Sequence, residues 1–277
     1  MTTTLTPQSS THIDPADRPV VRHIGLTRTA AQSVAMGYRG LLKLRHNPEQ
    51  LADVVFLPII FTLMFSYIFG GAVAGDVTSY LPLIVPGILV QTVITGSVVT
   101  GTQLREDMDK GVFDRFRSLP IARISPLAGA LMADVIRYLI AAVVCFLTGL
   151  AMGYHPAGGA LGLAGAVLLV MFCAWAISWI FALLGTLMSK ASSVQGISML
   201  VLFPLTFLSN AFVDTSTMPS WLGAFADVNP VSHLVTAVRE LANNGHFGIH
   251  VVYSLVGGAV IVAIFAPLTV RMYMRKA

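Results

Sequence analysis

The densest group of charged side chains in this sequence lies between Gly101 and Pro126, with long apolar stretches on both sides. Nine of the chain's thirty charged residues fall there: Arg105, Glu106, Asp107, Asp109, Lys110, Asp114, Arg115, Arg117 and Arg123. The chemistry that such a stretch offers is ion pairing and docking. Apolar residues recur within it at spacings of three and four, which predicts a short amphipathic helix through Val112, Phe113, Phe116 and Leu119.

Two interpretations of this charged segment stay open. It is either a solvated connection between two membrane spans or a docking helix that rests on the membrane protein and faces a cytoplasmic partner. Gly111 and Pro120 interrupt or end the predicted helix.

A second pair of charges, Asp134 and Arg137, lies inside an apolar stretch and three residues apart, on one face of a helix. A charge deep in a bilayer costs roughly 2.5–3.5 kcal/mol on the insertion scale, so the two charges are expected to offset each other. A polar site on a substrate path is the alternative. The spacing favours a local, intramembrane ion pair.

The motifs of catalysis and metal binding are missing from the sequence. It has no G-x-x-x-x-G-K-[ST] phosphate loop, no H-E-x-x-H and no G-x-S-x-G, and its seven histidines are scattered. Asp107-x-Asp109-x-Gly111 superficially resembles a calcium loop but lacks its closing ligands. We therefore predict no catalytic residue, no metal site and no cofactor in this chain.

The overall composition indicates the class of protein in which these charges lie. The chain has 277 residues, of which 55% are hydrophobic and 11% charged, and a mean hydropathy of +0.77. Soluble domains carry roughly 25% charged residues, so this chain belongs in a bilayer. Cys145 and Cys173 both lie in apolar runs, as buried small hydrophobic residues do.

The predicted fold class is an all-α integral membrane protein with six transmembrane helices. At about 20 residues a span, the apolar stretches place the spans near 51–71, 81–101, 127–152, 160–187, 194–213 and 250–270. Residues 1–25 read as a flexible cytoplasmic tail, and residues 26–277 as one transmembrane domain. Basic residues alternate with apolar ones over 26–46, which predicts an amphipathic helix in the membrane interface.

Lysine and arginine set the orientation. Fifteen of the 17 lie in the N-terminal region, the second and fourth loops or the C-terminal tail, and only Arg239 lies in the other loops. The positive-inside rule then places both termini and the charged segment in the cytoplasm. The fifth loop, about 213–249, is predicted to hold two short helices at the outer leaflet, separated by Asn229-Pro230.

The charged segment resembles the cytoplasmic loop of type-2 permeases of ABC transporters. The resemblance rests on Glu106-Asp107, Lys110-Gly111 and Asp114-Arg115 followed by F-R-S-L-P-I-A-R, with Phe116 where the family has Leu. Asn229-Pro230-Val231-Ser232 with Arg239 matches a second family segment before the last span. The small-residue-rich spans and Arg45-His46-Asn47-Pro48 are most similar to the daunorubicin-resistance type.

The resemblance implies a bacterial plasma-membrane exporter whose two permease chains pair above two separate ATP-binding subunits, which bind ATP and magnesium. The loop after span two is then the coupling helix, with these residues in contact with the ATPase: Glu106, Gly111, Phe113, Asp114, Phe116, Arg117, Pro120 and Arg123. The chain itself is implied to be a permease and not an enzyme. No nucleic-acid partner is expected.

In this family the substrate path is lined mainly by spans two and five. That implies a path through Gln91, Thr95, Phe203, Thr206, Phe207 and Asn210, a mixture of aromatic and neutral polar groups suited to an amphiphilic compound. The alternative is that the Thr and Asn side chains only hold helices together.

Three other functional alternatives stay open: export of a lipid, export of a lipid-linked glycan, and a membrane enzyme or scaffold that recruits a soluble partner. The identity of the substrate and the choice between a homodimer and a heterodimer of permeases also stay open. Export rather than import rests on the resemblance.

Overall fold

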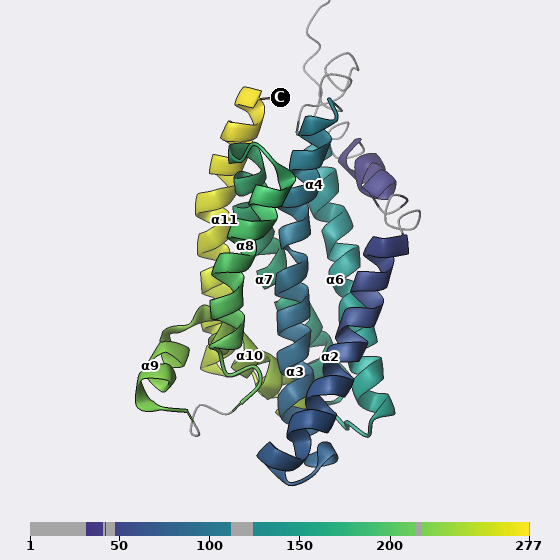
Figure 1. Ribbon diagram of the computed structural model, residues 1–277, viewed down its shortest axis with the longest axis vertical. Coiled ribbons are helices and arrows are strands. Elements are labelled where there is room, and N and C mark those ends of the chain that lie inside the picture. Colours follow the sequence, from purple (N-terminus) through teal and green to yellow (C-terminus); the bar gives the residue numbers. More distant parts are fainter. Residues whose placement is uncertain (1–31, 41, 43–47, 112–123, 214–217, 277) are drawn as a thin grey trace, which may run out of the picture.

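The computed structural model describes residues 32–40, 42, 48–111, 124–213 and 218–276. This part of the chain contains helices and no strands, which agrees with the predicted all-α class. The helices form an upright bundle (Figure 1). They are α2 (Pro48–Ala74), α3 (Val77–Gly96), α4 (Val98–Asp109), α6 (Ser125–Ala151), α7 (Gly159–Leu187), α8 (Ala191–Phe207), α9 (Ser220–Val228), α10 (Pro230–Arg239), η3 (Glu240–Asn244) and α11 (Ile249–Lys276).

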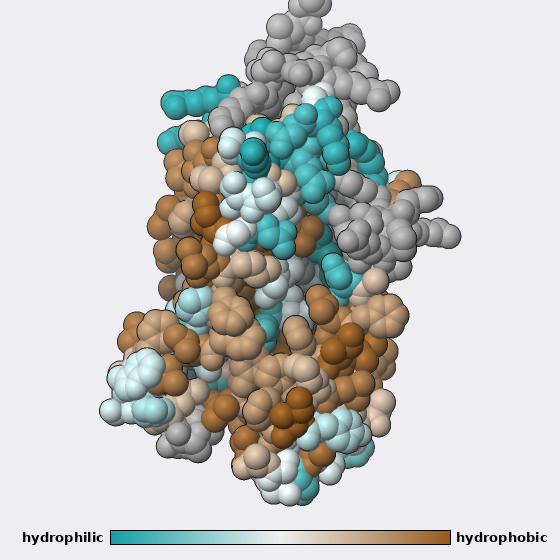
Figure 2. All heavy atoms as spheres, viewed as in Figure 1, coloured by the Kyte–Doolittle hydropathy of each residue, from teal (hydrophilic) through white to brown (hydrophobic). Residues whose placement is uncertain are grey.

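Burial is concentrated on α3. The side chains of Leu81, Ile84, Ile88 and Leu89 on this helix are fully buried. In contrast, α2 and α11 leave large apolar side chains exposed along their length, including Ile60, Tyr67 and Val256. A soluble protein could not leave such faces in water, whereas a membrane protein offers them to lipid or to another chain. The bundle therefore has a packed centre around α3 and an apolar exterior (Figure 2).

Five of the described helices are long and apolar enough to cross a membrane. The structure differs from the prediction at the span expected over 194–213. The helix found there, α8, is a shorter apolar helix that begins at Ala191 and ends at Phe207, because the chain turns at Leu208. Its 17 residues reach about 25 Å, less than the roughly 30 Å of a hydrocarbon core. Six full-length spans are thus not found in the described residues.

Span two also differs from its prediction. It was expected to end at residue 101, but the helix starts at Val77 and continues to Asp109, so the first part of the charged segment is helical. A local break at Ser97 divides it into α3 and α4. There the backbone N–H of Ser97 donates to the Ile94 carbonyl oxygen at 3.0 Å, a tighter turn than an α-helix makes. Gly–Ser pairs such as Gly96-Ser97 are common sites of helix kinks.

The predicted interfacial segment 26–46 is helical over 32–40, and the rest of it lies largely outside the described residues. The tail 1–25 lies outside them altogether. The helix packs on α6 through small residues: a Cβ on Gly129 would overlap Met36, and one on Gly40 would overlap Ala133. The segment is therefore tied to the third span as well as being amphipathic.

The loop before the last helix holds the short helices that the sequence predicted. Asn229 caps α10, since its side-chain oxygen accepts from the Val231 N–H at 2.9 Å, and Pro230 occupies the first turn. The Asn229 amide also donates to the Leu205 carbonyl oxygen, which joins α10 to α8. Helix α9 stands away from the bundle (Figure 1) and exposes Trp221 and Val228. Helix α10 continues into one π-helical turn, η3, which the sequence did not predict.

Candidate functional site

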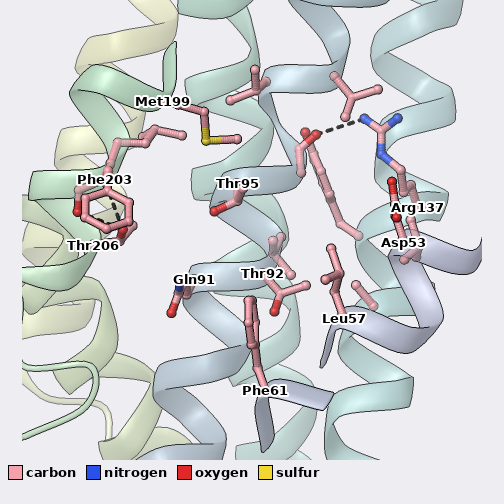
Figure 3. Close-up of a pocket in the computed structure, with 18 of the residues that line it drawn as sticks. Asp53, Leu57, Phe61, Gln91, Thr92, Thr95, Arg137, Met199, Phe203 and Thr206 are labelled. Atoms are coloured by element: carbon pink, nitrogen blue, oxygen red, sulfur yellow. Dashed lines mark hydrogen bonds between the residues drawn. The ribbon is translucent and has the colours of Figure 1, made fainter. Parts of the chain in front are cut away.

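A cavity of about 410 Å³ lies among α2, α3, α4, α6 and α8 (Figure 3). Its walls therefore come from four of the long helical segments of the predicted topology, the shorter α8 included. The larger side chains that line it are Leu57, Phe61, Gln91, Thr92, Thr95, Arg137, Tyr138, Met199, Phe203 and Phe207. A volume of this size falls in the range of small-molecule pockets.

Most of the wall is apolar, and two of its aromatic rings stack on each other. The rings of Phe203 and Phe207 stack with centroids 4.3 Å apart on α8. Phe61 and Leu57 face the cavity from α2, opposite Met199 on α8 (Figure 3). Aromatic side chains from two separate helices therefore line the same cavity, and an apolar ring can pack against them.

Two polar atoms in the same wall have no partner among the described residues. They are Oε1 of Gln91 and Oγ1 of Thr92. Gln91 is only 7% exposed, so its carbonyl oxygen is held away from water. A buried acceptor without a donor costs free energy, of order 1–3 kcal/mol. A ligand that donates a hydrogen bond at this position would remove that cost.

A charged pair lies at one edge of the cavity. Arg137 and Asp134, both on α6 and nearly fully buried, form a salt bridge. Asp134 accepts a second hydrogen bond from the Thr100 hydroxyl on α4, and Arg137 donates one to the Gly96 carbonyl oxygen at 3.2 Å. The arginine side chain faces the cavity (Figure 3), and Asp53 from α2 also lines it.

Five of the six residues predicted on a substrate path lie around this one cavity: Gln91, Thr95, Phe203, Thr206 and Phe207. The hydroxyl of Thr206 donates to the Leu202 carbonyl oxygen within its own helix. Asn210 is not among the lining residues. Its amide donates to the Thr236 hydroxyl at 2.8 Å, so it joins the turn after α8 to α10. The alternative of helix-joining polar groups therefore applies to Asn210.

Other lining residues were not singled out from the sequence. Leu57, Phe61 and Met199 are apolar side chains in apolar helices, and nothing in the sequence distinguishes them from neighbours that face lipid. For Thr92, only its position next to Gln91 on a helix could have suggested a role. Arg137, in contrast, was singled out from the sequence as part of an ion pair, because a charge in a span is unusual.

The predicted coupling residues fall mostly outside the described part of the chain: Phe113, Asp114, Phe116, Arg117, Pro120 and Arg123. Glu106 and Gly111 are described. Glu106 pairs with Lys110 at 3.4 Å on α4. Gly111 has a φ of +63°, which a side chain would oppose, so the helix ends there. Hydrophilic residues gather at this end of the bundle (Figure 2).

Neither cysteine is paired, and both are buried. Within the residues that the structure describes, no three His, Cys, Asp or Glu side chains come together in a way that could hold a metal ion. Two histidines do meet at the α10 end: Nδ1 of His233 on α10 lies 3.2 Å from Nδ1 of His250 on α11.

Comparisons with known proteins bear on what this arrangement does. Residues 31–242 match the model of the ABC-2 type transporter family. A daunorubicin resistance ABC transporter permease protein of Streptomyces coeruleorubidus, DrrB1, is 43% identical over 99% of this chain and 95% of its own length. A probable doxorubicin resistance ABC transporter permease protein of Mycobacterium tuberculosis, DrrC, is 26% identical over 78% of both chains. A putative transport permease of Porphyra purpurea, ycf38, is 25% identical over 76% of this chain and 73% of its own.

Proposed function

This chain belongs to the ABC-2 type transporter family, and we propose that it is the permease subunit of an ATP-driven exporter of a hydrophobic or amphiphilic, drug-like compound. ATP is hydrolysed by a separate subunit. The chain itself lacks a phosphate loop, so the energy for transport reaches it through contact with that subunit.

The observation that carries this proposal is the cavity between spans two and five. It combines stacked aromatic rings with a buried, unpartnered acceptor on Gln91. Apolar rings and a few fixed polar groups together suit a ligand with a planar apolar part and a hydrogen-bond donor. The relatives named for daunorubicin and doxorubicin resistance support the same class of substrate.

The orientation we propose has both termini in the cytoplasm of a bacterial cell and the chain in the plasma membrane. The asymmetry of lysine and arginine supports it. The polar end of the bundle, where α4 and α11 end, is then the cytoplasmic end (Figure 1). The α10 end lies outside. A second permease chain, identical or related, covers apolar surface left by one copy.

The contact with two ATP-binding subunits is proposed for the loop after α4. By resemblance to the family, the residues that make it are Glu106, Gly111, Phe113, Asp114, Phe116, Arg117, Pro120 and Arg123. Aromatic anchors next to arginines are a common composition of contact sites between proteins.

The first experiment is purification of the tagged chain from its own membranes in mild detergent, with Arg117→Glu as the test variant. We expect an ATPase subunit to copurify with the parent chain and to be lost from the variant. Arg115→Glu is the matched control, because it reverses a charge two residues away at a position that is not assigned to the ATPase contact. Absence of any ATPase from the parent preparation would favour the enzyme or scaffold alternative.

The second experiment is transport into inside-out membrane vesicles. ATP-dependent uptake of daunorubicin, followed by its fluorescence, supports the drug-like substrate, and Gln91→Leu is expected to lower it. A preparation that hydrolyses ATP but takes up labelled lipid instead of daunorubicin would favour the lipid alternatives.

A further inference from the structure

We propose that Ser97 is a hinge within span two and that the α6 ion pair, Asp134 and Arg137, is the positioning group that joins the two halves of that span. This inference rests on the proposed function, since it says how movement at the ATPase end would reach the cavity. It gives Asp134 and Arg137, on α6, a role in transport.

The first half of the span, α3, is fixed to elements at the α10 end. Pro86 has no N–H, so the carbonyl of Pro82 lacks its helical donor. The Asn243 amide donates to that oxygen at 2.8 Å. The next carbonyl, of Leu83, accepts two hydrogen bonds from Arg239 at 2.9 and 3.0 Å.

Arg239 also ties the chain after α8 to this group, because it donates to the carbonyl oxygens of Asn210 and Ala211 at 2.7 and 3.0 Å. Gly87 on α3 packs directly against the turn after α8, because a Cβ at this position would overlap the Ala211 carbonyl. The α3 helix, the turn after α8 and the α10–η3 region are therefore held as one unit.

The second half, α4, is fixed mainly by α7, whose opposite end packs against η3 at Gly162. A Cβ on Gly101 would overlap the Phe181 carbonyl, and one on Gly185 would overlap the carbonyl of Gly101. The backbones of α4 and α7 thus touch. Arg105 adds a hydrogen bond of 3.0 Å to the Met188 carbonyl oxygen at the end of α7. Helix α4 is therefore held against the end of α7, and the loop with the predicted coupling residues follows directly from α4.

The α6 ion pair bridges the two halves at the break. Arg137 donates to the carbonyl of Gly96, the last residue of α3, and Asp134 accepts from Thr100, in the first turn of α4. If α4 turns about Ser97, at least one of these two bonds must lengthen. The Nε atom of Arg137 has no partner among the described residues, and its side chain lines the cavity. A compound bound in the cavity would therefore contact Arg137, the residue that bonds to α3 at the break.

The variant that tests this role is Thr100→Val, which keeps the shape of the side chain and removes its hydrogen bond to Asp134. Thr102→Val is the matched control, because the Thr102 hydroxyl donates to the Val99 carbonyl in the same helix and, among the described residues, to no other helix. In the complex with its ATPase, we expect Thr100→Val to lower daunorubicin transported per ATP hydrolysed by about five-fold or more, the size of a typical coupling between sites. The control should remain near the parent value, and both should retain basal ATP hydrolysis.

A distance measurement tests the hinge directly. Spin labels at Thr78 and Lys110, the two ends of span two, are placed in the complex after both cysteines are replaced by alanine. We expect the label distance to change when ATP and vanadate are added, and its distribution without nucleotide to broaden in Thr100→Val. Equal coupling in Thr100→Val and Thr102→Val, or a label distance that nucleotide does not alter, would overturn the inference. A parent complex that hydrolyses ATP without transporting daunorubicin would instead contradict the proposed function, and the label distance would still report on the hinge.

Discussion

The two halves of span two, α3 and α4, are consecutive in the chain but are held in different ways. Helix α3 contains Pro82 and Pro86 and is fixed by side chains that donate to its free carbonyls, from Asn243 and Arg239. Helix α4 has no proline and is fixed by close backbone contact with α7 at Gly101. Prolines make a helix depend on polar donors from its neighbours, whereas glycines let it approach another helix directly. One membrane span is thus held by different contacts on the two sides of its break at Ser97.

The largest effect is expected where the two halves meet. Arg137→Ala leaves the carboxylate of Asp134 buried without its partner, and breaking a buried pair in this way costs about 3–5 kcal/mol. We expect the purified chain to lose thermal stability in detergent, or to fail to accumulate. The double variant Asp134→Asn/Arg137→Met removes both charges and should recover most of that loss. If the single and double variants were equally unstable, the pair would contribute by shape alone.

A smaller effect is expected within the α4 half. Gly101→Ala forces α4 away from α7, since the new Cβ has no space beside the Phe181 carbonyl, and overpacking of this kind costs about 1–3 kcal/mol. Gly196→Ala is the control, because nothing lies within 4 Å of its Cβ position. The comparison between α3 and α4 is sharpened by Gly87→Ala, which should loosen the α10 end instead. Hydrogen exchange measured helix by helix would distinguish the two variants: Gly101→Ala should speed exchange in α4, and Gly87→Ala should speed it in α10. Equally faster exchange in both helices of both variants would contradict the view that α3 and α4 are held separately.

The smallest effect is a pH dependence at the α10 end. Partial burial, with the nearby His250, lowers the pKa of His233 below its usual value of 6.5, while Asp227 opposes the shift. Tyr253 packs against both histidine rings. Because the folded state binds the His233 proton less well than the unfolded chain does, the stability from this contact is present above pH 6.5 and is lost as the pH falls below it.

The measurement is exchange in α10, corrected for intrinsic rates, at pH 7.5 and pH 5.5, each within about one unit of an unperturbed histidine pKa. We expect faster exchange in α10 at the lower pH and no such change in α4. His233→Gln should remove the difference, and His246→Gln, at an exposed position, should leave it. An equal change in α4 would argue against the view that α3 and α4 are held separately.

The sequence alone determined the features that depend on local pattern. Apolar runs and the scarcity of charge give the membrane class, and most span boundaries lie within a few residues of the observed helices. The spacing of Asp134 and Arg137 gives their pairing, because residues three apart always share a helical face. The Asn229-Pro230 start of α10 is likewise a property of neighbouring residues.

The tertiary structure decided which helical faces meet, because that depends on contacts between residues far apart in the chain. The cavity is lined by residues from four different helices, among them Phe61, Gln91, Arg137 and Phe203. Asn210 does not line it and instead donates a hydrogen bond to Thr236. The early end of α8, the break at Ser97 and the extension of α4 to Asp109 follow no apolar periodicity. They reflect where distant donors reach a carbonyl and where a glycine lets two backbones touch, and such contacts exist only once the helices have packed.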